Sequence, residues 1–141
     1  MKTQNKAYPL KHLIVMTAKG TLDLDASKIA LKSLSTDPDF NVRCEVLLDL
    51  RDVECFMSEF ELFELAKHMT FPDLALPTLK RIALLVDGQV AFNHAHFLEL
   101  CTQSRGLNVH AFEDYETANE WLNAELPQDP KGIGSTPEAP S

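Results

Sequence analysis

The order of apolar segments along the chain predicts an α/β fold in which strands alternate with helices. Short apolar runs at residues 13–17, 44–50, 81–86 and 109–112 have the length and composition of strands. In the segments between these runs, apolar residues recur at helical spacing. Strands that alternate with helices favour a parallel or mixed sheet covered by helices.

The first strand is expected at residues 13–17, where the run is short and apolar. A helix is expected over residues 22–34, because its apolar residues do not alternate as they would in a strand. Asp23 or Asp25 can cap the start of this helix, and the pair Asp37-Pro38 ends it.

The second strand, residues 44–50, is almost uninterruptedly apolar, which is typical of a central parallel strand buried on both faces. We expect a charged turn at residues 51–52 after it. The next helix is expected over residues 58–69. Ser58 and Glu61 have the spacing of a capping box, in which each side chain bonds the backbone amide of the other residue.

The third strand is expected at residues 81–86 and ends at Asp87-Gly88, a pair typical of turns. A helix is expected over residues 91–104, with Arg105-Gly106 as its end.

The fourth strand is expected at residues 109–112. Asp114 then caps a last helix, which carries Ala118, Trp121 and Leu122 on one side. An additional edge strand is expected at residues 8–11.

The chain is expected to form one domain over residues 1–126, followed by a tail. Its length of 141 residues suits a single core. Residues 127–141 are rich in proline and glycine, which predicts a disordered tail.

Composition argues against several classes of partner and location. The net charge is −8 and the pI is about 5.0, so binding to nucleic acid or to anionic membranes is not expected. The apolar runs are too short to span a bilayer. Cys44, Cys55 and Cys101 are odd in number and widely spaced, which fits reduced thiols in a cytoplasmic protein.

Two segments resemble the STAS superfamily, the fold of bacterial anti-sigma-factor antagonists and of sulfate-transporter cytoplasmic domains. Residues 48–53 followed by Phe56-Met57-Ser58 look like the strand, turn and helix start that carry the phosphorylatable serine of the antagonists. Residues 109–114 and the helix after them are similar to the end of a bacterial STAS-like branch. That branch is also compared with the lipid-binding fold of CRAL-TRIO proteins.

The resemblance implies a STAS-like mixed sheet of four or five strands, with about four helices packed mainly on one face. It also implies that Ser58 is the phosphoacceptor. The antagonists have an acidic residue before this serine and a small residue and glycine after it, whereas this chain has Met57, Glu59 and Phe60.

Polar residues at predicted strand ends form a candidate rim. In open α/β sheets, ligands bind at the carboxyl ends of the strands. These residues could hold a cation or act as acid and base, or they could simply form turns and cap helices. Their spacing matches no specific metal motif, so we predict no catalytic, metal or cofactor site. The rim residues are Asp49, Arg51, Asp52 and Asp87.

The pair His94 and His96 suggests a metal site at first sight. Residues at i and i+2 point to different faces of a helix, so these histidines are expected to be structural or solvated.

A set of apolar residues around the helix at 58–69 and the loop at 70–79 is the candidate binding surface. These residues could belong to the core and a packed loop, or they could form a hydrophobic groove or a dimer face. The set comprises Phe56, Met57, Phe60, Phe63, Phe71, Leu74 and Leu76.

We therefore predict a non-enzymatic regulatory or protein-interaction module of the anti-sigma-antagonist type, which binds a protein partner or forms a homodimer. The alternative is a carrier or sensor of a lipid or other apolar small molecule.

Overall fold

Five strands form one mixed sheet in the computed structural model, which describes residues 1–40, 44–76, 79–129 and 131. The strands are β1 (Lys2–Tyr8), β2 (Leu13–Leu22), β3 (Glu45–Cys55), β4 (Arg81–Leu85) and β5 (Val109–Phe112). They lie side by side in chain order. β1 is antiparallel to β2, and the others run parallel. The predicted mixed α/β sheet is confirmed.

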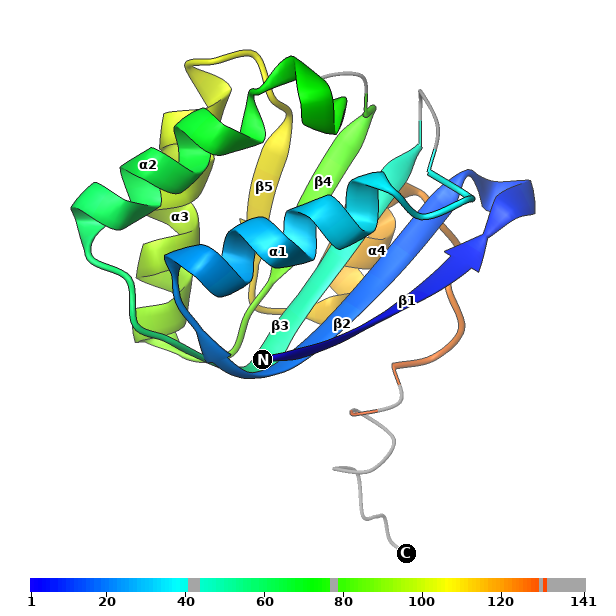
Figure 1. Cartoon of the computed structure of the whole chain (residues 1–141). Coiled ribbons are helices and arrows are strands. Elements are labelled where there is room, and N and C mark those ends of the chain that lie inside the picture. The colour runs from blue at the N-terminus through cyan, green and yellow to red at the C-terminus, as the bar shows by residue number, and fades with distance from the viewer. Residues whose placement is uncertain (41–43, 77–78, 130, 132–141) are drawn as a thin grey trace, which may run out of the picture.

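Three of the four α-helices in the described part of the chain cover one face of this sheet, and the last covers the other. The helices are α1 (Leu24–Ser35), α2 (Glu59–Met69), α3 (Gln89–Gln103) and α4 (Tyr115–Leu122). Figure 1 shows α1, α2 and α3 on one side of the sheet and α4 on the other. This arrangement confirms the prediction of helices packed mainly on one face.

Local capping signals set the starts of three helices as the sequence predicts. The Asp23 carboxylate, rather than that of Asp25, accepts a hydrogen bond from the Ala26 amide at 2.8 Å. Ser58 and Glu61 form the expected capping box at the start of α2. Asp114 caps α4.

The alternation of side chains along the strands produces two cores. Residues such as Ile14, Val46 and Leu84 face α1, α2 and α3 and belong to the larger core. Their neighbours Leu13, Leu47 and Leu85 face the opposite side, where they pack with residues of α4. Each central strand is therefore buried on both faces, as its continuous apolar sequence indicates.

The turn predicted at Arg51-Asp52 is wrong, because β3 continues through both residues to Cys55. The cause is pairing with β2, which has 10 residues against the 11 of β3. Asp52 lies opposite Lys19, and opposite charges at paired positions favour such an extension. The pairing register shifts by one residue on β3, which marks a bulge in this strand.

The edge strand predicted at residues 8–11 lies earlier, at Lys2–Tyr8, and Pro9–Lys11 forms a 3-10 turn instead. β1 is mostly polar and exposed, so its sequence carries no pattern of burial. Backbone pairing with β2 along its whole length determines its place in the sheet.

The first residues of the predicted tail contact the domain. The Tyr115 hydroxyl donates a hydrogen bond to the Pro127 carbonyl at 2.9 Å, and Asp129 pairs with Arg51. Lys131 is also described, whereas residues 130 and 132–141 of the tail lie outside the described part of the chain. Disorder of those residues therefore stays a prediction.

Candidate functional site

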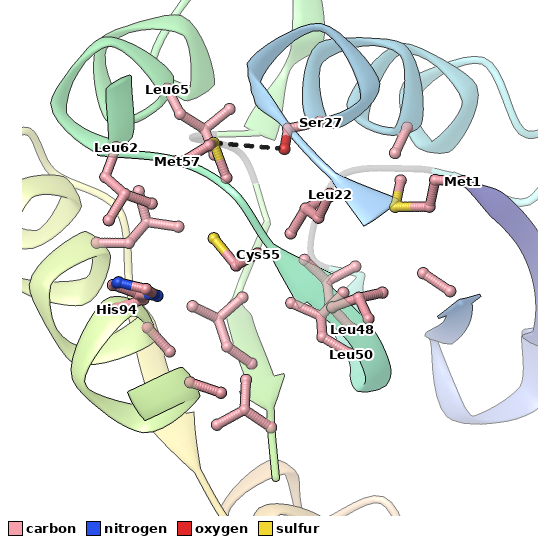
Figure 2. Close-up of a pocket in the computed structure, with 18 of the residues that line it drawn as sticks. Met1, Leu22, Ser27, Leu48, Leu50, Cys55, Met57, Leu62, Leu65 and His94 are labelled. Carbon is pink, nitrogen blue, oxygen red and sulfur yellow. Dashed lines mark hydrogen bonds between the residues drawn. The ribbon is translucent and has the colours of Figure 1, made fainter. Parts of the chain in front are cut away.

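A cavity of about 100 Å³ lies between the sheet and the three helices that cover its main face. Figure 2 shows its lining, to which β2, β3, α1, α2 and α3 each contribute labelled side chains. The lining is almost entirely aliphatic or sulfur-containing. It includes Leu22, Leu48, Leu50, Val53, Met57, Leu62, Leu65, Ala91, Ala95 and Leu98.

The cavity lies toward the carboxyl ends of the parallel strands. β3 contributes Leu50, Val53 and Cys55 from the segment beyond its bulge, and β4 is followed directly by Val86. In open α/β sheets this edge is where ligands bind. The strand extension that the sequence did not predict therefore builds part of the cavity wall.

Small side chains on α3 help to explain why the space stays open. Ala91, His94, Ala95 and Leu98 all line the cavity, and their spacing of i, i+3, i+4 and i+7 places them on one helix face. Two of these four are alanines, which leave space where larger aliphatic residues would reach the sheet.

The lining contains few polar groups, and one of them lacks a partner. The Ser27 hydroxyl donates a hydrogen bond to the Asp23 carbonyl at 2.7 Å. Burial raises the pKa of the Cys55 thiol, so this thiol stays protonated at neutral pH. Within the described part of the chain, the buried Nδ1 atom of His94 has no hydrogen-bond partner.

The seven residues predicted as a binding surface fall into two groups. Met57, Leu74 and Leu76 are buried in the larger core. Of these three, Met57 also lines the cavity. Leu74 and Leu76 therefore belong to the core, which was one of the alternatives for this set. Residues 77–78 of the same loop lie outside the described part of the chain.

The four phenylalanines of that set are exposed to solvent. The exposed fractions are 63% for Phe56, 71% for Phe60, 39% for Phe63 and 49% for Phe71. Phe56, Phe60 and Phe63 lie just before α2 or on it, and we call these three the aromatic patch. None of the four lines the cavity, so they do not form the hydrophobic groove that was one of the alternatives for this set.

Ser58 has a structural role as the N-cap of α2. Its hydroxyl accepts a hydrogen bond from the Glu61 amide at 3.2 Å, and the Glu61 carboxylate accepts one from the Ser58 amide at 3.1 Å. A phosphate at a helix start is favoured by the helix dipole. Here it would meet the carboxylates of Glu59 and Glu61, so phosphorylation stays a prediction without support from this geometry.

The predicted polar rim does not form one site. The Asp49 carboxylate accepts hydrogen bonds from the Arg51 guanidinium at 2.9 Å, and Asp129 accepts from the same guanidinium at 2.7 Å. Burial alone would lower the pKa of Arg51, but the two carboxylates raise it, so the guanidinium remains charged. Asp52 pairs separately with Lys131, and Asp87 is exposed.

Asp49 and Arg51 form an anchor that holds the C-terminal segment through Asp129. Asp49 and Arg51 alternate with Leu48 and Leu50, which line the cavity, so the anchor lies on the opposite face of β3.

The histidines on α3 do not share a site. His94 lines the cavity, whereas His96 is half exposed and stacks on Phe92 with ring centroids 6.0 Å apart. Their separation confirms that they lie on different helix faces. Among the described residues, no group of three or more histidine, cysteine, aspartate or glutamate side chains could hold a metal.

The sequence contains one signal for the cavity. Ala91, His94, Ala95 and Leu98 have the spacing of a single helix face, which places an imidazole among apolar residues on the core side. The prediction that His94 and His96 are structural or solvated did not include a cavity beside His94.

No described helix combines the length and the apolar composition that crossing a membrane would require.

Comparison with known proteins identifies the fold. No protein-family model and no curated protein matches the chain. The structure is similar to the crystal structure of an uncharacterised protein of the DUF3478 family from Shewanella loihica PV-4, described as having a SpoIIAA-like fold. The TM-score is 0.53 at 16% sequence identity, and the match covers 86% of this chain and 92% of that chain. The chain therefore has the SpoIIAA-like, or STAS, fold that its order of strands and helices predicted.

Proposed function

We propose that the protein is a non-enzymatic module that binds an apolar small molecule in the cavity between the sheet and α1, α2 and α3. The observation that carries this proposal is the unfilled apolar space itself. Protein interiors are normally packed so closely that few voids exceed the size of a water molecule. Of the two predicted functions, the geometry favours the carrier or sensor over the partner-binding module.

The size of the cavity limits the ligand. An engineered apolar cavity of about 150 Å³ in another protein binds benzene. A cavity of about 100 Å³ suits a molecule of similar size or the end of an alkyl chain. Larger ligands would require the helices to move away from the sheet.

The position of the cavity supports a sensor rather than a simple carrier. The SpoIIAA-like fold suggests a module related to the anti-sigma antagonists, whose phosphorylatable serine lies at the start of the helix equivalent to α2. Met57 and Leu62 line the cavity and flank this helix start. A bound molecule would contact both residues and could thereby alter the surface that a partner meets.

The experiment uses Cys55 as a reporter, because its thiol lines the cavity (Figure 2). Benzene is added, and the alkylation rates of Cys55 and of the partly exposed Cys101 are followed by mass spectrometry. We expect benzene to slow the alkylation of Cys55 alone. In Ala95→Leu, which fills the cavity, this protection should disappear. Equal rates with and without benzene in the unmodified protein would refute the proposal.

A second candidate function is supported by the aromatic patch. Phe56 and Phe60 expose most of their surface next to the start of α2. Exposed aromatic residues are enriched where proteins bind one another. This patch could bind a protein partner or a second copy of the chain.

The test for this candidate is the variant Phe60→Glu. We expect it to abolish any self-association or complex seen by native mass spectrometry, without lowering the melting temperature. Ile29→Glu is the matched control, because Ile29 on α1 is also 71% exposed and lies outside the patch. Association that persists in Phe60→Glu would remove the aromatic patch as a binding surface.

A further inference from the structure

The imidazole of His94 is a polar group in the cavity lining to which a purely apolar ligand could not hydrogen-bond. Its Nδ1 atom is buried, and within the described residues it has no hydrogen-bond partner. Leaving a buried polar group unpaired costs about 1–3 kcal/mol. Figure 2 shows the ring at the α3 side of the cavity, among the side chains that line it.

The other polar side chains of the lining do not compete for this role. Ser27 already donates its hydroxyl hydrogen to the Asp23 carbonyl, and its oxygen lies 3.9 Å from the Met57 sulfur. The neutral thiol of Cys55 is only a weak hydrogen-bond donor. His94 is therefore the lining side chain with a strong and available hydrogen-bonding atom.

The start of α3 adds a preference for negative charge near the same end of the cavity. Its N-cap is Gly88, which has no side chain to cap the helix, and its first turn contains no acidic residue. By contrast, α1 and α2 are capped by Asp23 and Ser58. Unpaired amides and the helix dipole favour an anion at a helix start.

Ala91 and His94 connect the helix start with the cavity. Both line the cavity, and they lie one turn apart on the same face of α3. Asp87 precedes this helix but is exposed to solvent, so its charge is screened. A ligand group beside His94 would therefore lie within the first two turns of the helix.

We propose that the ligand is a short-chain carboxylic acid, whose alkyl chain fills the cavity of about 100 Å³ and whose carboxyl group hydrogen-bonds Nδ1 of His94. This inference rests on the proposed function and specifies its ligand class. A carboxyl group suits either state of the imidazole. A neutral ring accepts a hydrogen bond from the hydroxyl of the protonated acid, and a protonated ring donates one to the carboxylate.

The test compares pentanoic acid with pentan-1-ol, which has the same chain length but no charge. Affinities are measured by isothermal titration calorimetry near neutral pH, and protection of Cys55 from alkylation confirms that each ligand occupies the cavity. We expect pentanoic acid to bind about 10- to 100-fold more tightly than the alcohol, the range for a hydrogen bond to a charged group.

The variant His94→Leu should remove this preference and keep the binding of the alcohol, which also shows that the variant is folded. His96→Leu is the matched control, because His96 lies on the same helix but points away from the cavity. It should keep the full preference. If His94→Leu fails to fold, His94→Gln replaces it and should retain part of the preference through its amide.

The outcomes separate this inference from the proposed function. Equal affinity of the unmodified protein for pentanoic acid and pentan-1-ol, with Cys55 protected by both, would overturn the carboxylate preference and leave the apolar site intact. An undiminished preference in His94→Leu would overturn the role of His94. If neither ligand binds or protects Cys55, the proposed function itself fails.

Discussion

Filling the cavity from α3 should stabilise the protein, and Ala95→Leu is the substitution that does so most directly. Ala95 is buried, lines the cavity and lies next to His94 on the helix. Leucine is also compatible with a helix interior. The three added carbon atoms would point into the space between α3 and the sheet.

The expected gain follows from the size of the cavity. Removing an apolar cavity is worth about 24 cal/mol per Å³, so complete filling of about 100 Å³ would contribute about 2.4 kcal/mol. Burial of three carbons at about 0.8 kcal/mol each gives the same magnitude. An imperfect fit costs about 1–3 kcal/mol, so we expect a net gain of about 1 kcal/mol.

The assay is urea denaturation of the unmodified protein and the variant, with the midpoints compared at equal slope. Ala118→Leu is the matched control, because Ala118 is fully buried on α4 but does not line the cavity. Overpacking there should destabilise the protein by about 1–3 kcal/mol. If Ala95→Leu destabilises the protein as much as Ala118→Leu, the space beside Ala95 is not available and the reasoning is refuted.

Two further predictions concern a helix cap and the anchored C-terminal segment. Ser58→Ala should lower the free energy of unfolding by about 1 kcal/mol in urea denaturation, whereas Ser58→Asp should nearly preserve it; equal losses would contradict the capping role. Burial, followed by the charge of Asp129, raises the pKa of Tyr115 to about 12 from an ordinary value of 10.0. The folded state therefore retains this phenol proton more tightly, and stability should fall as the pH rises from about 10 to about 12. In a Tyr8→Phe background, phenolate absorbance should show the late titration, and Asp129→Asn should shift it to lower pH; an unchanged midpoint would exclude an effect of that charge.

Local sequence signals determined most of the secondary structure. β5 occupies the predicted residues 109–112, and the capping residues Asp23, Ser58 and Asp114 begin the helices that were expected. These features depend on side-chain to backbone contacts within a few residues, so the sequence alone contains the information.

Long-range pairing decided where two strands lie. β3 continues through Arg51 and Asp52 because β2 offers paired positions such as Lys19. The polar segment Lys2–Tyr8 is a strand only because β2 accepts its backbone hydrogen bonds. The segment Lys2–Tyr8 is mostly exposed, and residues 51–55 alternate between half-buried and exposed positions. Neither segment has the continuous apolar run that identifies the central strands.

The candidate site depended still more on tertiary structure. The sequence places His94 on an apolar helix stripe between Ala91 and Ala95, which determines that its ring faces the core. It does not determine that the facing residues of the sheet and of α1 and α2 leave a space there. The space is the part of the volume between the packed elements that their side chains do not fill. It exists only once the helices and the sheet have taken their positions.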